Sequence, residues 1–269
     1  MNYTLSVPNI TNYRVKYYFS HKPVIERAHS FPPHIHDELE VYILLEGDAS
    51  FIVNNNIYKL TSGDVVISCP NEIHNCILNT NSVHKHLCFW FDPSCEYVFE
   101  KFLNLKGEHP HLISPIDEEK AALLSLYTRL EKASENSNSL QQFYLQLNIL
   151  DILGNNLNNK LSTTTIPQIL QDILDDVANS FTEINCLEFF IEKYQLSQSK
   201  LNRIFKKYLN TTPKAYLETK RLAYSRTLLK EEGKSVFDAC MQSGFTDYSN
   251  YIRSFKKRFG ITPNQYKNK

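Results

Sequence analysis

The final third of the chain contains one basic, helix-forming segment twice, at a constant offset of 50 residues. Residues 199–207 (SKLNRIFKK) recur as residues 249–257 (SNYIRSFKK), and each copy is followed by Thr-Pro and then a tyrosine. In both copies apolar residues recur at helical spacing, with polar and basic residues on the opposite side. A repeated basic helix predicts repeated contact with a periodic, anionic partner.

The formal net charge of zero hides an uneven distribution of charge. Residues 1–180 hold 12 Lys/Arg against 21 Asp/Glu, a net of −9, whereas residues 181–269 hold 17 against 8, a net of +9. The basic part is therefore the candidate nucleic-acid surface. Charge alone would equally fit an ordinary solvated surface, and the repeat is what favours nucleic acid.

Length and cysteine usage limit the class of protein. A chain of 269 residues can form two domains that each bury a core. The six cysteines include no C-x-x-C pair, which favours reduced thiols over a disulfide framework or a zinc finger. We find no secretory signal in the first 30 residues, and apolar runs such as residues 41–45 are too short to span a membrane. We expect a soluble, cytoplasmic protein without membrane contact.

Short β-branched and aromatic runs, separated by turn residues, occupy the first 91 residues. Gly47, Gly63 and the run Asn54-Asn55-Asn56 mark turns between them. This spacing favours an antiparallel sandwich or barrel. The predicted strands are residues 15–19, 24–28, 38–45, 50–53, 57–60, 64–68, 75–78 and 85–91.

Three histidines and a glutamate form a candidate site in this region. His34, His36 and Glu40 have equal parity, so in an extended chain they share one face, which Tyr42 continues. A returning strand could bring His74 beside them. The pattern H-x-H-x3-E-x6-G, completed by Gly47, resembles the first motif of the cupin barrel. The second cupin motif fits less well, because Pro70 and His74 are one residue closer than in metal-binding cupins and residues 71–72 replace a glycine.

This cluster allows three interpretations that the residues leave open. His34, His36, Glu40 and His74 could hold a divalent metal such as Zn, Mn, Fe or Ni. The same residues with Tyr42 could instead line a pocket for an organic effector, as the resemblance to sugar-sensing barrels implies. They could also be structural or surface residues. The other pairs, His84/His86 and His109/His111, are weaker candidates, and we expect Trp90 to pack in the core.

After Pro93 the apolar spacing becomes helical. Apolar residues predict helices near residues 97–105, 121–130 and 143–153, which either cover the barrel or provide a dimer interface. A polar stretch follows, so we place a sensor domain at residues 1–158, a linker at 159–167 and a second domain at 168–269.

The second domain contains residues that typically begin and end the helices of two helix-turn-helix units. Asn185 with Glu188 predicts a capped helix over 186–194, and Ser197 predicts the start of the next one. Pro213 predicts the start of a long helix that ends by Gly233. A second pair of helices then follows, over 236–242 and after Thr246 or Asp247. The expected buried residues of the two basic helices are Leu201, Ile204, Phe205 and Tyr208, and Tyr248, Ile252, Phe255 and Phe259.

These residues carry a resemblance to the AraC/XylS family of bacterial transcription regulators. It covers about residues 182–266 and is strongest over 244–247 (GFTD), 255–257 (FKK) and 259–260 (FG), with Thr262, Pro263 and Tyr266. The resemblance implies two helix-turn-helix units, joined by a long helix, that enter successive major grooves about 34 Å apart. Departures from the family pattern lie on the packing or turn side, at Ile191, Gln195, Asn210 and Cys240.

The sequence thus predicts a multi-domain α+β chain: an N-terminal cupin-like antiparallel β-barrel with following helices, and a C-terminal all-α domain with two helix-turn-helix units. We expect a regulator, not an enzyme, that binds double-stranded DNA under control of a small-molecule effector such as a sugar or related metabolite. The alternatives are a metal-dependent cupin enzyme or a metal-responsive regulator. A homodimer is expected, with RNA polymerase as a partner of an activator. The candidate DNA-binding residues are Ser197, Gln198, Ser199, Lys200, Asn202, Arg203, Lys206, Lys207, Thr246, Asp247, Tyr248, Ser249, Asn250, Arg253, Lys256 and Lys257.

Overall fold

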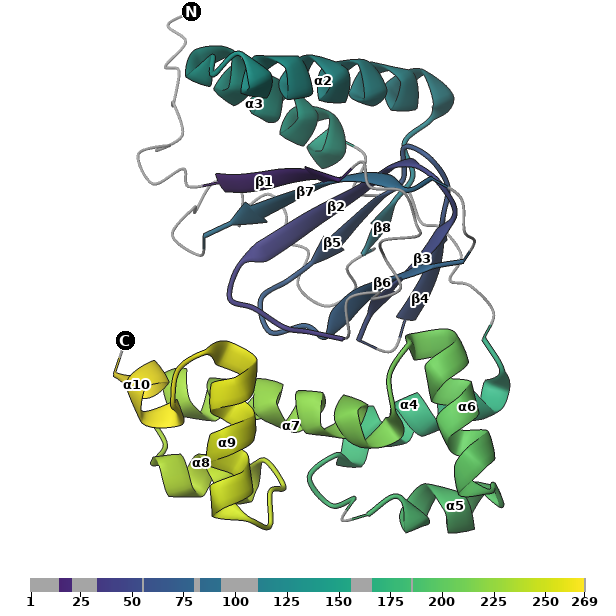
Figure 1. The fold of residues 1–269 in the computed structure, drawn as a ribbon, viewed down its shortest axis with the longest axis vertical. Helices are drawn as coiled ribbons and strands as arrows, with labels where there is room; N and C mark the ends of the chain where they lie inside the picture. Colours follow the sequence, from purple (N-terminus) through teal and green to yellow (C-terminus); the bar gives the residue numbers. More distant parts are fainter. Residues whose placement is uncertain are drawn as a thin grey trace, which may run out of the picture.

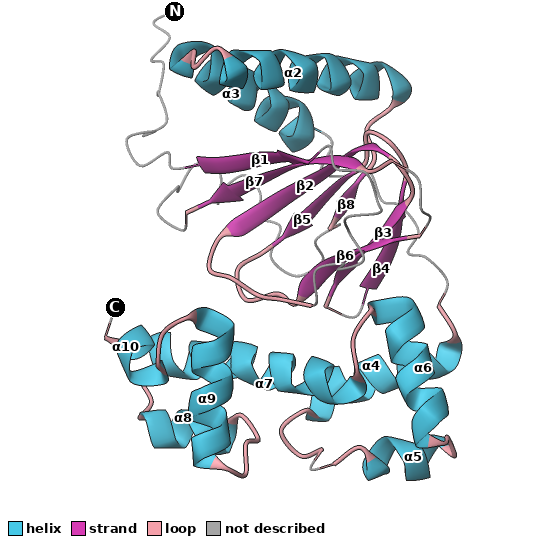
Figure 2. Cartoon of the chain, viewed as in Figure 1, coloured by secondary structure: helices cyan, strands magenta, loops and turns pink. Residues whose placement is uncertain are grey.

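A computed structural model describes residues 15–20, 33–54, 56–79, 83–92, 111–155, 166–184 and 186–268. Strands come first, two helices follow them, and the rest of the chain is helical (Figure 1). In Figure 2 the helices after residue 166 lie on one side of the strands, and the two earlier helices lie on the opposite side. The predicted multi-domain α+β architecture is confirmed.

The strands form two antiparallel sheets. One sheet has the order β1-β7-β2-β5-β8 and the other has the order β4-β3-β6. In the first sheet, Glu40 on β2 lies opposite Trp90 on β7, and Tyr42 lies opposite Cys88. The strands are β1 (Val15–Ser20), β2 (Leu39–Glu46), β3 (Ala49–Val53), β4 (Asn56–Leu60), β5 (Val65–Ser68), β6 (His74–Leu78), β7 (Lys85–Phe91) and β8 (Leu112–Ile113).

Alternation along the strands divides the barrel residues between two cores. Tyr42 and Leu44 point between the two sheets and pack with Phe51. Residues of the other parity, such as Val41 and Ile43, pack on the outer side of the larger sheet. Seven predicted strands agree with the structure within one residue at each end, whereas the two-residue β8 was not predicted. The strand expected at 24–28 and the helix expected near 97–105 lie outside the described residues.

Helices α2 (Asp117–Glu135) and α3 (Ser139–Asn155) cover the outer side of the larger sheet (Figure 1). Leu123, Tyr127 and Leu130 of α2 lie in the same buried cluster as the strand residues. Burial of such side chains contributes roughly 1.5–3 kcal/mol each, which fixes the helices on the sheet. On α3, Leu140 and Tyr144 are 80% and 56% exposed, so the residues that the structure describes leave part of that helix uncovered.

The last part of the chain is entirely helical. Helix α4 (Gln168–Ser180) was not predicted, although Leu170, Ile173, Leu174 and Val177 are buried along it at helical spacing. The remaining helices are α5 (Glu188–Tyr194), α6 (Gln198–Leu209), α7 (Pro213–Lys230), α8 (Val236–Gln242), α9 (Tyr248–Phe259) and α10 (Pro263–Lys267). Among the described residues, none of the helices combines the length and apolarity that crossing a lipid bilayer requires.

The helix starts follow side-chain capping. The side chains of Ser197, Thr212, Ser235 and Asp247 each accept a bond from the backbone N–H three residues later. The predicted start of α5 is wrong: the helix begins at Glu188, its N-cap has no side-chain bond, and Asn185 lies outside the described residues.

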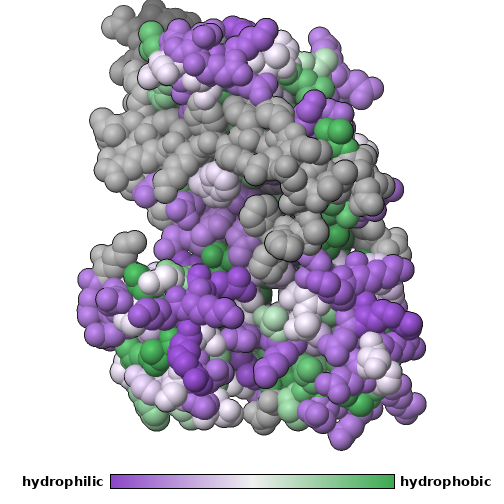
Figure 3. Space-filling view, in the orientation of Figure 1, coloured by the Kyte–Doolittle hydropathy of each residue, from purple (hydrophilic) through white to green (hydrophobic). Residues whose placement is uncertain are grey.

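The helical domain packs against the open end of the strand domain. One buried cluster combines Ile35, Ile52 and Ile73 of the strand domain with Tyr216 and Leu217 of α7. The Tyr216 hydroxyl donates a hydrogen bond of 2.9 Å to the backbone oxygen of Asn54. The visible face of the helical domain is otherwise mostly hydrophilic (Figure 3).

Candidate effector site and nucleic-acid interface

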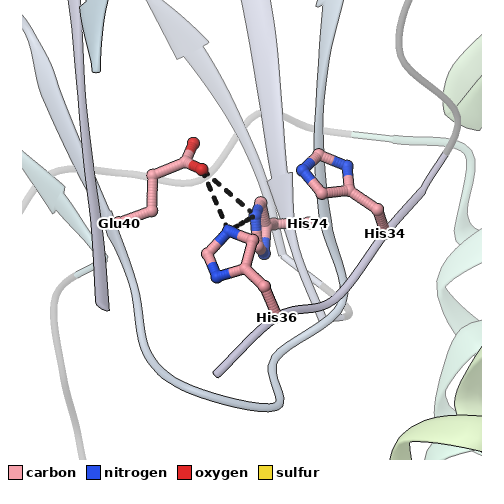
Figure 4. A group of neighbouring side chains, drawn as sticks. All are labelled: His34, His36, Glu40 and His74. Carbon is pink, nitrogen blue, oxygen red and sulfur yellow. Dashed lines mark hydrogen bonds and ion pairs between the residues drawn. The ribbon is translucent and has the colours of Figure 1, made fainter. Parts of the chain in front are cut away.

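The structure brings together the four residues of the predicted site, His34, His36, Glu40 and His74. His34 and His36 precede β2, Glu40 lies on β2, and His74 begins β6. The Nε2 atom of His36 lies 3.1 Å from Oε2 of Glu40, and that of His74 lies 3.5 Å from the same oxygen (Figure 4). One potential ligand atom from each residue lies within 4.8 Å of those of the other three.

Backbone groups orient the imidazoles. Nδ1 of His36 lies 3.0 Å from the carbonyl oxygen of Glu38, and Nδ1 of His74 lies 2.9 Å from that of Glu72. Each Nδ1 therefore donates its proton to that carbonyl oxygen. In a neutral ring Nε2 then carries no proton, and its lone pair is directed into the site. His34 and His74 also exchange two backbone hydrogen bonds of 3.1 and 3.0 Å, which fix their segments side by side.

The two Nε2 atoms of His36 and His74 lie 3.1 Å apart. Two lone pairs at this distance repel unless a proton or a metal ion lies between or beside them. Three imidazoles and a carboxylate are the donor set that Zn, Mn, Fe and Ni accept. The residues therefore fit a divalent transition metal, which His34, His36, Glu40 and His74 would hold.

The charges at the site depend on one another. Burial by itself would raise the pKa of Glu40, yet the charge of a protonated His74, with hydrogen bonds that His36 and His74 donate from Nε2 only when their rings carry a second proton, holds it well below the usual range. Burial by itself would lower the pKa of His74, but the Glu40 carboxylate outweighs it and the pKa is raised. The site thus keeps a buried anion that favours a bound cation.

Trp90 packs against the core between the two sheets, as predicted, and its indole also reaches the site. It is half-buried, and its indole Nε1 donates a hydrogen bond of 2.6 Å to Oε2 of Glu40. The strand register explains this contact, because Trp90 lies opposite Glu40 on the neighbouring strand. The spacing of residues along the sequence carries no signal for that pairing.

Tyr42 lies deeper in the barrel and is not part of the four-residue cluster. Its hydroxyl lies 2.9 Å from Nε2 of His84 and 3.3 Å from Sγ of Cys76. Burial raises its pKa well above the usual range. His84, a weak candidate from the sequence, is buried and bonded to Tyr42, so the barrel interior is more polar than expected. His109 lies outside the described residues, and His111 is buried against the backbone of Ile67.

The predicted DNA-binding residues lie on and before α6 and α9. All are exposed except Asn202, which is half-buried. Leu201 and Phe205 bury the opposite side of α6, as predicted. The prediction that Tyr248 is buried on α9 is wrong, because Tyr248 is 42% exposed and Tyr251 is buried in its place. The buried Phe255 follows Tyr251 by four positions, which is about one helical turn, so both face the core.

The two sites are connected by residues that alternate with the histidines. Ile35 and Ile73 pack into the cluster that includes α7, whereas the adjacent histidines face the barrel. Asp37 forms an ion pair with Arg226 of α7 and accepts a hydrogen bond of 3.1 Å from Tyr266 of α10. Because neighbouring residues in extended chain point to opposite sides, the wall of the site is also the surface that contacts the helical domain.

Both the N-terminal and the C-terminal part of the chain resemble known protein families. A family described as a helix-turn-helix domain matches residues 191–269, and one described as an AraC-like ligand binding domain matches residues 23–95. The transcriptional activator RhaR of Mannheimia succiniciproducens is 27% identical over 260 residues, covering 91% of each chain. The transcriptional activator RhaS of Escherichia fergusonii is 24% identical over 249 residues, covering 88% of this chain and 87% of RhaS.

ToxT from Vibrio cholerae aligns over 96% of this chain and 97% of its own, with a TM-score of 0.38 and 14% identity. The C-terminal domain of the response regulator yesN from Fusobacterium nucleatum aligns over 38% of this chain and 99% of its own, with a TM-score of 0.36 and 30% identity.

Proposed function

The chain belongs to the AraC family of DNA-binding transcription regulators, and we propose that a divalent transition metal held by His34, His36, Glu40 and His74 controls its binding to DNA. In this proposal the sensor domain comprises residues 1–158, the linker 159–167 and the DNA-binding domain 168–269. Its relatives are regulators and not enzymes, so the metal acts as a signal and not as a catalyst.

One observation carries the proposal of control. The metal-site residues alternate along the chain with residues that contact the helical domain: Ile35 and Asp37 flank His36, and Ile73 precedes His74. A metal that draws the imidazoles together would shift both segments. Metal binding is therefore coupled to the position of the DNA-binding domain. This coupling controls DNA binding if the metal-bound and metal-free positions of that domain bind DNA with different affinity.

DNA recognition is assigned to the exposed faces of α6 and α9. Lys206, Lys207, Lys256 and Lys257 would contact phosphates and supply salt-dependent affinity. The base-reading residues would be Ser199, Asn202, Arg203, Asn250 and Arg253, which combine amide, hydroxyl and guanidinium donors.

The direct test measures metal and DNA binding on the full chain. Titration of the chelator-treated protein with Zn²⁺, Mn²⁺, Fe²⁺ and Ni²⁺ should reveal one site per chain for at least one metal. Operator DNA, selected from random duplexes, should then bind with different affinity in the presence of that metal and of chelator. If none of the four metals binds stoichiometrically, the metal proposal is wrong, whereas DNA binding would stand.

A second candidate is an organic effector, such as a sugar or related polar metabolite. The polar interior beyond Glu40 supports it, since Tyr42, His84 and Trp90 offer hydroxyl, imidazole and indole groups. A thermal-shift screen of sugars and glycosides, with metals in parallel, would distinguish the two candidates, because a ligand of the folded state raises its melting temperature.

Two further partners complete the proposal. Homodimerisation would use the exposed side of α3 at Leu140 and Tyr144. RNA polymerase would be a partner if the protein activates transcription.

A further inference from the structure

At Gly244, in the turn between α8 and α9, the second helix-turn-helix unit touches the connecting helix α7 and the turn that leads from α4 into the first unit. A Cβ atom at Gly244 would lie 2.8 Å from both Cα and the carbonyl oxygen of Thr182 and 3.0 Å from Nε of Arg221. Thr182 lies in the turn that follows α4, and Arg221 lies in the connecting helix α7. In Figure 2 the turn between α8 and α9 lies next to the turn that follows α4. No side chain other than hydrogen fits between them.

Arg221 bonds the same turn from the other side. Its Nε donates a hydrogen bond of 3.0 Å to the carbonyl oxygen of Phe181, and its Nη2 donates one of 2.6 Å to that of Ile184. A planar guanidinium can bridge two carbonyl oxygens in this way, whereas a lysine amine is a single point of charge. Arg221 therefore joins the turn that follows α4 to the middle of α7. Gly244 of the second unit contacts both of these segments.

The corresponding turn of the first unit shows that the turn itself accepts a side chain. There Gln195 ends α5 with φ 50°, and it is exposed. Gly244 has φ 88°, which is also in the left-handed region. A Cβ atom at Gly244 would meet a neighbouring backbone, whereas Gln195 carries its side chain in an exposed position.

Gly260 provides an internal comparison. It also has a positive φ, 75°, but a Cβ atom there would meet nothing within 4 Å. Its counterpart in the first unit is Asn210, with φ 50°. Asparagine is thus compatible with this backbone conformation in this fold, and the close approach is specific to Gly244.

The recognition helix of the second unit is also fixed to α7. Nη2 of Arg258 on α9 donates a hydrogen bond of 2.6 Å to Oγ1 of Thr219, which is buried on α7. Phe259 packs against the buried clusters of both units. The orientation of α9 relative to α6 therefore depends on the contacts around α7.

We propose that Gly244 and Arg221 form a junction that fixes the spacing and orientation of the two recognition helices, so that the operator is read by one rigid body. Both act as positioning residues and need not touch DNA. Two linked reading units gain affinity only when their geometry matches both half-sites, so a distorted junction lowers affinity and relaxes the required spacing. This inference depends on DNA binding and not on the effector.

The test compares variants of the full chain on the selected operator and on versions with one base pair inserted or removed between the half-sites. Each inserted pair rotates one half-site by about 34–36° relative to the other. Wild type should bind the altered operators roughly 10-fold or more weakly. Gly244→Asn should bind the original operator roughly 10-fold more weakly than wild type and discriminate less between spacings. The matched control Gly260→Asn should behave as wild type.

Arg221→Lys provides a second, independent variant, because it keeps the charge but cannot bridge the two carbonyl oxygens. It should also lose spacing discrimination while its melting temperature stays close to that of wild type. If Gly244→Asn does not fold, the Arg221→Lys result decides. Wild-type affinity and wild-type spacing preference in Arg221→Lys, or in a folded Gly244→Asn, would overturn the junction.

Discussion

The guanidinium of Arg226, in the DNA-binding domain, is paired with the carboxylate of Asp37, the residue that follows the site histidine His36. Arg226 is 2% exposed, and its guanidinium carbon lies 4.9 Å from the centroid of the Phe259 ring and 5.1 Å from that of the Tyr266 ring. Tyr266 accepts a hydrogen bond of 3.2 Å from Arg226 and donates one to Asp37. A buried charge that loses its partner is destabilised, so movement of Asp37 acts directly on the second helix-turn-helix unit.

Replacing Asp37 should separate metal binding from DNA binding. In Asp37→Asn the carboxylate is lost, so the ion pair with Arg226 is lost, while the four metal-binding side chains remain. We expect unchanged metal affinity by calorimetry and a loss of the metal-dependent change in operator affinity. Glu46→Gln, which removes an exposed ion pair with Lys85 at the far end of β2, is the matched control and should respond to metal as wild type does. A full metal response in Asp37→Asn would exclude this contact as the connection.

Trp90 should report on metal binding, because its indole bonds Glu40 and it is the one tryptophan in the sequence. A metal that engages the carboxylate alters this hydrogen bond, so metal addition should change the tryptophan emission. In Glu40→Gln we expect this response to vanish and metal affinity to fall by at least roughly 10-fold. Loss of a residue that only supports a metal ligand lowers metal affinity by that factor, and loss of the ligand itself should lower it at least as much. Unchanged emission in wild type at saturating metal would contradict the placement of Glu40 as a ligand.

Arg203 should read bases. It is exposed on α6, and Arg203→Ala should cost about 1–3 kcal/mol on the operator while affecting random DNA less. Competition binding with both DNAs checks this, and equal losses on both would show that Arg203 contacts only phosphate.

Lys257 should contact phosphate. Lys257→Ala should weaken operator and random DNA alike, and the slope of log K against log salt should become shallower by about 0.9. The slope is obtained from binding isotherms at several salt concentrations, and a larger loss on the operator than on random DNA would contradict the assignment.

The exposed side of α3 should mediate dimerisation. Leu140 and Tyr144 are 80% and 56% exposed, so Leu140→Asp with Tyr144→Asp should shift a dimer to monomer in sedimentation experiments. Ser125→Asp, an exposed position on α2, is the control for added charge and should leave the assembly unchanged. A dimer that survives the double substitution would place the interface elsewhere.

The fold could be predicted where local patterns determine structure. Runs of β-branched and aromatic residues between turn residues identified strands such as β2 and β7, and capping residues such as Ser197 and Asp247 marked helix starts. The two-residue β8 could not be predicted, because so short a strand has no periodicity and depends on pairing with β5. Helix α4 had an apolar stripe that could have identified it.

The candidate site could be predicted in part. The motif spacing identified His34, His36, Glu40 and His74, which the structure brings together. The contacts of Trp90 and of Asp37 could not, because they depend on strand register and on the docking of the helical domain, which bring together residues 50 and 189 positions apart. Tyr248 was misassigned because the true stripe on α9 is shifted to Tyr251.

Under the proposed control, metal binding and operator binding are coupled within one chain. The most direct measurement is metal affinity of the full-length protein with and without saturating operator, beside operator affinity with and without saturating metal. Coupling predicts that both affinities change by the same factor, within the usual range of about 5- to 150-fold. A metal affinity that is identical with and without operator would contradict the account.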